Sequence, residues 1–173
     1  CVNALAETLR MEIHRDGAVY EQYFERGAVA SELKQIGKTK KTGTIITFKP
    51  DDQIFDEINF SLDTLSTRLR ELSFLNQGLK ITLKDERSSE DDRVFYYEGG
   101  IKSFVAHLNK NKKVINKEPI FIQGESDGCI CEVALQYNEN YQENVFTFAN
   151  NINTIDGGSH LAGFRASLTR AVN

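Results

Sequence analysis

The residues Thr42, Gly43 and Thr44 form the first segment of this sequence whose composition suits ligand binding. A glycine lets the backbone approach a ligand closely, and a threonine hydroxyl can both donate and accept a hydrogen bond. The β-branched run from Thr44 to Phe48 predicts a strand that ends at Pro50 and would hold the hydroxyl rigidly. Spacing alone leaves two explanations open, a binding segment or a structural turn, and the turn is the simpler one.

Three further segments carry polar groups in patterns that could bind ions. Asp156-Gly157-Gly158 precedes a predicted helix, so its backbone amides could bind an anion or form a tight turn. The basic segment NKNKK at 109–113 could contact phosphate, but a basic helix end explains it more simply. The acidic loop at 85–92 lacks the Asp-x-Asp-x-Gly spacing of a calcium loop and is interpreted as a solvated turn.

The sequence has three cysteines, and two of them, Cys129 and Cys131, are separated by one residue. On a strand this spacing directs both side chains to one face. Since His14, His107 and His160 are scattered along the chain, we predict that the cysteines pack in a core rather than bind a metal. Free cysteines fit a reduced, cytoplasmic setting.

Neither a nucleophile motif nor a phosphate-binding loop is recognisable. The sequence contains no G-x-S-x-G and no G-x-x-x-x-G-K-[ST] pattern, so no catalytic residue is assigned. The net charge is −4, and residues 51–98 carry six basic and twelve acidic residues. No segment is basic enough to hold nucleic acid by phosphate contacts alone, and no apolar run is long enough to cross a membrane.

The elements that must position these residues alternate between helices and strands. Val2, Leu5 and Leu9 predict an opening helix, and Asp16-Gly17 predicts a hairpin turn between two alternating runs. A leucine stripe predicts a helix over 61–78, and further helices are expected at 101–113 and from 159 to the C-terminus. Strands are expected at 119–123, 128–137 and 144–150, the last two joined by the loop NENYQE. The remaining expectations are a cap by Ser159 and buried helix faces formed by Leu62, Leu65, Leu69 and Leu72, by Ile101, Phe104, Val105 and Leu108, and by Leu161, Phe164, Leu168 and Val172.

Several long stretches together resemble the B-subunit family of bacterial DNA gyrase. They are VNALAETLRMEIHRDG, KTGT before a strand, TRLRELSFLNQGLKITLKD, YYEGGIKSFVAHLNKNK and FANNINTIDGGSHLAGFRASLTRAVN. The resemblance runs through essentially all 173 residues in order. The homologous subunit of topoisomerase IV shares the plan, but the form NNINTIDGGSHLAGFR favours gyrase.

The resemblance implies an α+β fold in two parts. Residues 1–98 would be the C-terminal part of a GHKL-type ATPase sandwich, with helices over one face of a mixed sheet. Residues 99–173 would be most of a transducer domain similar to domain 2 of ribosomal protein S5, truncated at its C-terminal end. Such a domain couples ATP-driven dimer closure to DNA strand passage and negative supercoiling, and Gly99-Gly100 is the expected joint.

The resemblance also implies roles for four residues. Gly43 and Thr44 match a pair whose threonine helps hold adenine, Ile46 matches an apolar lining position, and Arg15 matches a rim arginine at which coumarin-type inhibitors bind. Each has a simpler alternative: a turn residue for Thr44, core packing for Ile46 and a surface charge for Arg15.

In this family the ATP lid and the catalytic carboxylate precede the matched segment, and a lysine-bearing loop follows it. We therefore expect a fragment that is inactive alone, with ATP and Mg²⁺ bound by the full-length parent and not by this piece. The expected partners of the parent are the gyrase A subunit, DNA and a second copy of the parent, without a membrane. Uncovered sheet surface predicts that the piece self-associates or has a poorly ordered N-terminal region.

Two other functions remain open. A stand-alone nucleic-acid-binding module with an S5-like half would bind DNA or RNA in a salt-sensitive manner, which a gyrase fragment need not do. A stand-alone ATPase would need the carboxylate and lid that this sequence lacks.

Overall fold

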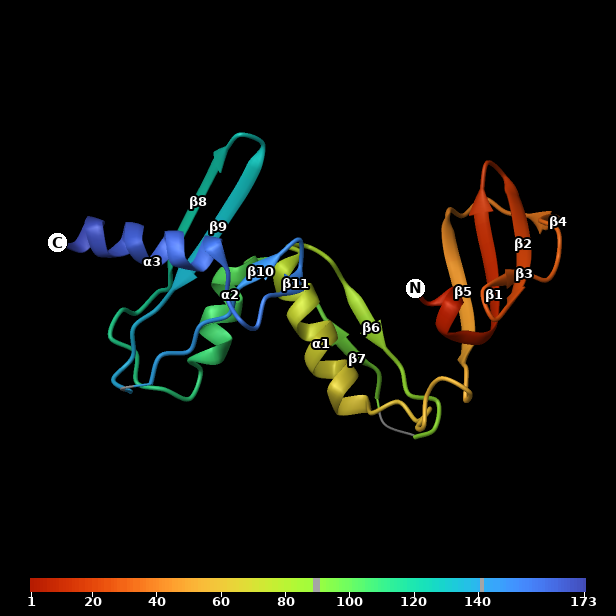
Figure 1. Cartoon of the computed structure of the whole chain (residues 1–173), viewed down its shortest axis with the longest axis horizontal. Coiled ribbons are helices and arrows are strands. Elements are labelled where there is room, and N and C mark those ends of the chain that lie inside the picture. Colours follow the sequence, from red (N-terminus) through yellow and green to blue (C-terminus); the bar gives the residue numbers. More distant parts are fainter. Residues whose placement is uncertain (89–90, 141) are drawn as a thin grey trace. The chain divides into compact units, whose positions relative to one another are not determined.

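Residues 1–88, 91–140 and 142–173 are described by the computed structural model of the chain (Figure 1). The chain divides into two units, Cys1–Phe60 and Ser61–Asn173, and each is considered by itself. The predicted solvated turn at 85–92 and the loop NENYQE include residues 89–90 and 141, which lie outside the described residues. None of the helices in the described part of the chain has the length and apolar character needed to cross a membrane.

The first unit is built on one five-stranded sheet with the order β3-β2-β1-β5, and β4 also pairs with β2. All of its strand pairings are antiparallel, so the mixed sheet implied by the resemblance is not found among the described residues. Its buried apolar residues are Ala6, Leu9, Ala18 and Val19. The elements are η1 (Asn3–Leu5), β1 (Ala6–Arg15), β2 (Ala18–Glu25), β3 (Ala28–Val29), β4 (Lys34–Lys38) and β5 (Gly43–Pro50).

The predicted opening helix is wrong. Only Asn3–Leu5 form a single 3-10 turn, and the chain from Ala6 to Arg15 is strand β1. This strand pairs with β2 on one side and with β5 on the other. A short helical pattern contributes little stability by itself, so pairing on both edges decides the conformation. The alternation of Leu9, Met11 and Ile13, which also lies in this segment, was the better signal.

The predicted Asp16-Gly17 hairpin is confirmed. Arg15 pairs with Ala18, and Asp16 and Gly17 between them have φ angles of 53° and 80°. Both central residues of this kind of turn need positive φ, which Asp and Gly adopt at low cost. Three other two-residue turns with positive φ occur among the described residues, at Arg26-Gly27, Asp127-Gly128 and Asn150-Asn151.

The second unit combines three helices with three separate two-stranded antiparallel pairs, β6–β7, β8–β9 and β10–β11, among its described residues (Figure 1). Its helices are α1 (Leu62–Leu75), α2 (Gly100–Leu108) and α3 (Ser159–Val172). Its strands are β6 (Ile81–Leu83), β7 (Arg93–Phe95), β8 (Ile120–Ser126), β9 (Cys129–Leu135), β10 (Phe148–Ala149) and β11 (Ile152–Asn153).

Helix α1 is the best predicted element of this unit. The Ser61 hydroxyl accepts a hydrogen bond from the Thr64 amide at 3.3 Å, which caps the first turn. The leucine stripe is only half-buried, whereas Ser66, Ser73 and Phe74 are buried. The helix therefore packs on a face that includes Phe74, next to the stripe that the sequence indicates.

An aromatic cluster around Phe74 forms the centre of the second unit. Phe74 is 1% exposed, and its ring stacks on Tyr97 with 3.6 Å between centroids. The rings of Phe104 and His107 from α2 lie 5.1 and 5.5 Å away. The half-buried Phe104 is one of the inward positions predicted for the second helix. Aromatic pairs of this kind join α1 to α2.

Three predictions in the second unit need correction. The strand predicted at 144–150 is confined to β10, which pairs with β11 across the Asn150-Asn151 turn. Ser159 is the first residue of α3 and makes no capping hydrogen bond, because Gly158 occupies the cap position. Cys129 and Cys131 lie on one strand as expected, but both are exposed, so the predicted core packing is wrong.

Candidate functional site

The register between β1 and β5 places Thr44 and Ile46 on one face of the first sheet. Thr44 lies opposite Ile13 and Ile46 lies opposite Met11. Paired residues of antiparallel strands project to the same face, and residues two apart on a strand share that face. The Thr44 hydroxyl, the side chain of Ile46 and those of Met11 and Ile13 therefore form one surface, which we call the β1–β5 face. Ile46 is 46% exposed on it.

Arg15 lies at one end of the β1–β5 face. It follows Ile13 by two residues on β1, so its side chain leaves the same side of the sheet. The guanidinium is exposed, and its Nε lies 3.4 Å from the carboxylate of Asp16. An exposed ion pair of this length contributes little stability, so the guanidinium is available to a ligand.

Gly43 begins β5 next to Arg15. It pairs with His14, and its φ of 153° lies outside the range that residues with a side chain favour. A Cβ at this position would meet no atom within 4 Å, so the backbone angle, and not a lack of space, favours glycine here. The segment before it is tied to the β1–β2 turn, because the Thr39 amide donates to the Gly17 carbonyl at 3.0 Å.

The opposite face of the sheet carries a network of charges. The Arg10 guanidinium donates to Glu21 at 2.6 Å and to Glu12 at 2.9 Å, and Glu12 also pairs with the His14 ring at 2.7 Å. The hydrogen bond to Glu21 raises the pKa of Arg10 above its usual value. This face is therefore polar, whereas on β1 and β5 the β1–β5 face is mostly apolar, with the Thr44 hydroxyl and the Arg15 guanidinium as its polar groups.

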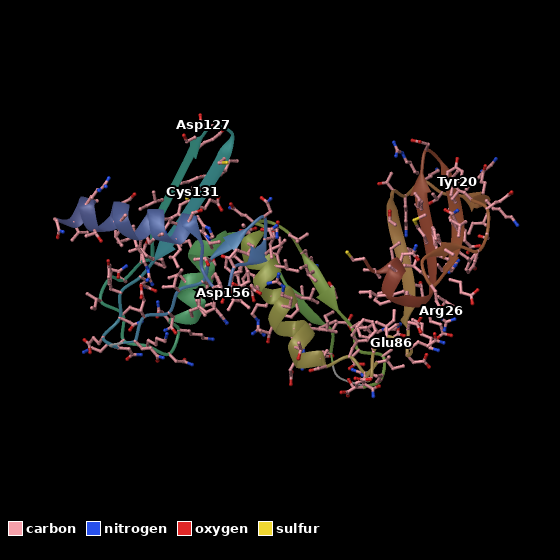
Figure 2. The ribbon with its side chains drawn as sticks, in the orientation of Figure 1. Tyr20, Arg26, Glu86, Asp127, Cys131 and Asp156 are labelled. Carbon is pink, nitrogen blue, oxygen red and sulfur yellow. The ribbon has the colours of Figure 1, made fainter. Side chains whose placement is uncertain are left out.

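An ion pair between the exposed Arg26 and the buried Asp51 closes the far end of the sheet. The Asp51 side chain is 3% exposed and accepts a hydrogen bond at 2.8 Å from Nε of Arg26, which lies in the β2–β3 turn (Figure 2). The Gln53 amide, followed by the Arg26 guanidinium, lowers the pKa of Asp51. The Asp51 amide donates to the Leu5 carbonyl, so the end of β5 is fixed beside the start of β1.

The composition of the β1–β5 face suits binding better than bond cleavage. Its registered positions on β1, β2 and β5 include no Asp, Glu, His or Cys among the described residues. A hydroxyl that donates and accepts, beside flat apolar surface, is suited to the edge and face of a heterocyclic base. The described residues also contain no group of three His, Cys, Asp or Glu that could hold a metal ion.

The register adds Met11, Ile13 and Tyr20 to the four residues named from the sequence. Tyr20 on β2 lies opposite Ile13, so a row of three side chains, Thr44, Ile13 and Tyr20, crosses three strands. Figure 2 labels Tyr20 on this sheet. The alternation on both sides of Asp16-Gly17 is the signal that could have found Ile13 and Tyr20, because a two-residue turn fixes which residues face each other.

The other candidate segments have structural roles. The Gly157 amide donates to the Thr154 carbonyl at 2.8 Å, which supports the tight-turn interpretation of 156–158. In the 109–113 segment Asn109 is buried, and its side-chain amide donates to Gln136 at 3.0 Å. Lys113 forms an ion pair with Glu139 at 2.7 Å. This segment is therefore held against the end of β9 by polar contacts.

The family model and the relatives to which this chain is similar carry the same description, DNA gyrase B. The DNA gyrase B family model matches residues 100–173. The DNA gyrase B protein of Clostridium acetobutylicum is 53% identical over 173 residues, covering 99% of this chain and 27% of that protein. The DNA gyrase B protein of Bacillus mycoides is 50% identical, covering 99% of this chain and 43% of that protein. The chain therefore spans less than half the length of these relatives.

Two solved structures share the fold. One is the 43K ATPase domain of Thermus thermophilus gyrase B in complex with an aminocoumarin, with a TM-score of 0.87, 36% identity and coverage of 99% of this chain and 47% of that one. The other is the B-subunit of the DNA gyrase from Myxococcus xanthus, with a TM-score of 0.86, 25% identity and coverage of 96% and 49%. The predicted α+β class is confirmed by this similarity.

Proposed function

Because this chain is a homologue of DNA gyrase B over 99% of its length, we propose that it forms part of the ATP-binding subunit of a bacterial DNA gyrase. The subunit would couple ATP binding and hydrolysis to DNA strand passage and negative supercoiling. The observation that carries the proposal is the identity of about half of all residues along the whole segment. The names of these relatives favour gyrase over the homologous subunit of topoisomerase IV.

We propose that the β1–β5 face is one wall of the nucleotide pocket. Thr44 would hydrogen bond to the adenine, Ile46 would pack against it, and Gly43 would let the backbone come close. This assignment is supported by the shared side of Thr44 and Ile46 and by the exposure of both residues. Arg15 at the end of the same face would be the rim residue for aminocoumarin-type inhibitors, since a related ATPase domain is known in complex with an aminocoumarin.

We further propose that residues 1–98 belong to the ATPase domain and residues 99–173 to the transducer. The start of the family match at residue 100 supports this boundary, whereas the compact units divide at Phe60 and Ser61. Gly100 has a φ of 54°, and a Cβ there would lie 3.7 Å from the Phe74 carbonyl oxygen. Motion at the Gly99-Gly100 joint would therefore have to repack the aromatic cluster around Phe74.

The proposed cofactors and partners belong to the complete subunit. ATP would be bound partly by the β1–β5 face, and the 173-residue chain alone would not hold it, because Thr44 and Ile46 lie on an open sheet surface. The described residues contain no group of three metal-ligating side chains, so Mg²⁺ would be held by other parts of the subunit. The gyrase A subunit, DNA and a second copy of the complete subunit in the bacterial cytoplasm would complete the enzyme.

Two threonines on the same strand provide a matched test of the proposed pocket. Thr44 and Thr47 are three residues apart on β5, so their side chains project from opposite faces. In a complete subunit that carries this segment, Thr44→Ala should weaken binding of a non-hydrolysable ATP analogue by about 10-fold, the value of one hydrogen bond. Thr47→Ala should leave the affinity unchanged.

The measurement is isothermal calorimetry of both variants and the wild type. Equal affinity of all three proteins would show that the Thr44 hydroxyl does not contact the nucleotide. Loss of affinity in the Thr47 variant alone would assign the pocket to the other face of the sheet.

A further inference from the structure

Cys129 and Cys131 form an exposed pair of thiols on the β8–β9 hairpin. Both are free and exposed, and both lie on β9 (Figure 2 labels Cys131). Residues two apart on a strand project to the same face, with about 6.7 Å between their Cα atoms. The two thiols are therefore neighbours on one side of the hairpin.

The surroundings of the pair leave room for a bound group. The unbroken register places Gly124 opposite Cys131 and Ser126 opposite Cys129. Gly124 has no side chain, and a Cβ there would meet nothing within 4 Å. The Ser126 hydroxyl donates to the Asp127 carboxylate at 3.5 Å, and Cys129 opposite Ser126 is exposed. On the same face, Ile122 lies opposite Val133 and provides adjacent apolar surface.

This geometry does not favour a disulfide within the pair. The Cα separation expected in a strand is at the upper limit for a disulfide, and the two Cβ bonds run parallel instead of converging. Both thiols can, however, lean toward one soft atom that lies between them. Thiolates are the protein ligands that soft, thiophilic centres prefer.

The number of ligands distinguishes among thiophilic centres. Structural zinc takes four protein ligands, and catalytic zinc takes three. The described residues contain no group of three His, Cys, Asp or Glu, so the pair lacks the further donors that zinc needs. A monosubstituted trivalent arsenic needs only two thiolates, because its third bond is to its own carbon.

We propose that Cys129 and Cys131 form a dithiol site that captures monosubstituted trivalent arsenicals. In the reaction, two cysteine thiols and one R–As=O give R–As(S–Cys)₂ and one water. Two As–S bonds form, while two S–H bonds and the As=O bond break, and the two protons leave with the oxygen as water. Arsenic stays trivalent, so neither an oxidant nor a reductant is consumed. The site is independent of the proposed nucleotide pocket.

The test uses the reduced 173-residue chain and phenylarsine oxide as the probe. Intact mass spectrometry should show one phenylarsenic group per chain, retained during a wash with excess glutathione and released by dithiothreitol. Cys129→Ser and Cys131→Ser should each lower the apparent affinity at least about 100-fold, since chelation becomes attachment through one thiol. Cys1→Ser, which changes the remaining cysteine, should bind like the wild type.

A second variant tests the shared face. The double variant Cys131→Ser and Glu132→Cys keeps two cysteines on β9 but places them on opposite sides of the strand. It should lose glutathione-resistant binding, while circular dichroism confirms that the strand content is kept. Retention by this variant or by either single serine variant would overturn the proposal, as would loss in Cys1→Ser. Tight Zn²⁺ binding that competes with the arsenical would overturn the two-ligand assignment.

Discussion

At the scale of single residues, the β1–β5 face owes its character to the Thr44 hydroxyl, which lies among the apolar side chains of β1 and β5. The Thr44 hydroxyl can select a ligand because a hydrogen bond is directional. The neighbouring side chains of Ile13, Ile46 and Met11 provide apolar contact, which is not directional. Comparing Thr44→Ala with Thr47→Ala therefore distinguishes loss of a ligand contact from loss of β-strand propensity. Both substitutions change β-propensity equally, and only one removes a polar atom from the proposed pocket.

His107 gives the second unit a dependence on pH. His107 is an exposed residue overall, but partial desolvation of its ring beside Phe74, followed by the positive charges of Arg70 and Lys110, lowers the pKa of His107 below its usual value. The unfolded chain therefore takes up this proton at a higher pH than the folded chain does. Protonation of His107 therefore does not affect the free energy of unfolding above about pH 6.5, the pKa of the unfolded group. The free energy of unfolding decreases as the pH falls below this value.

We expect the melting temperature of the second unit to decrease when the pH is lowered from about 7.5 to about 5.5. Near-UV circular dichroism of the aromatic cluster measures this melting temperature. His107→Gln keeps a polar side chain that does not titrate, so it should reduce this pH dependence. If the slope is the same in both proteins, protonation of His107 is not its origin.

At the scale of elements, the aromatic cluster joins α1 to α2 through the rings of Phe74, Phe104 and His107. Phe74→Ala should destabilise the second unit by roughly 3–5 kcal/mol, as expected for removal of a buried aromatic ring. Phe146→Ala is the control, because Phe146 contacts Phe104 at 5.5 Å from an exposed position and should cost roughly 1 kcal/mol or less. Urea unfolding monitored by helix content measures both values, and equal losses would exclude a central role for Phe74.

The β8–β9 hairpin depends on the positive φ of its turn. Gly128 has a φ of 76°, so Gly128→Ala should destabilise the hairpin by about 1 kcal/mol. Gly124 lies within β8 of the same hairpin, with open space at its Cβ position, and Gly124→Ala should cause no loss. Hydrogen exchange of the β8 and β9 amides checks both. Similar exchange in the two variants would mean that the turn does not limit hairpin stability.

The sequence was sufficient to predict structure that depends on a few neighbouring residues. It was insufficient where the conformation or burial depends on residues distant in the chain. Asp16-Gly17 acts within a few residues and is found as predicted, whereas the predicted cap by Ser159 is replaced by Gly158. The opening segment became a strand because β5, far along the chain, pairs with it. Exposure of Cys129 and Cys131 also depends on what lies opposite, which the C-x-C spacing does not contain.

The candidate site divides in the same way. The choice of Gly43, Thr44, Ile46 and Arg15 came from resemblance to the family, since T-G-T alone is as typical of a turn. Their shared face then follows from strand register, which also adds Ile13 and Tyr20. Ligand roles for these residues stay predictions until the Thr44 and Thr47 variants are measured.

At the scale of the whole molecule, each unit has a small core of its own. Ala6, Leu9, Ala18 and Val19 are buried in the first unit, whereas Phe74 and Phe95 are the buried apolar residues described in the second. Several apolar residues of β5 stay exposed, including Ile45, Ile46 and Phe48. Among the described strands β5 pairs only with β1, so its outer edge offers free backbone groups.

We therefore expect the isolated 173-residue chain to self-associate in a concentration-dependent manner. Light scattering after size-exclusion chromatography measures this directly. Ile45→Lys, which places a charge on the exposed edge strand, should shift the chain toward the monomer. A monodisperse wild-type monomer at high concentration would contradict the prediction.

The pairing of β5 with β1 also determines the order in which the strands of the first unit assemble during folding. The β1–β2 hairpin closes through two residues, and such hairpins form within about 1–10 μs. Strand β5 joins only after the chain between residues 15 and 43 has closed into a loop, which costs more conformational entropy. Ile13 and Arg15 are therefore already ordered in the β1–β2 hairpin before Thr44 and Ile46 are placed beside them by the pairing of β5. On a ribosome, the candidate binding face would be the last part of this unit to assemble, because the residues that β5 contributes are synthesised after those of β1 and β2.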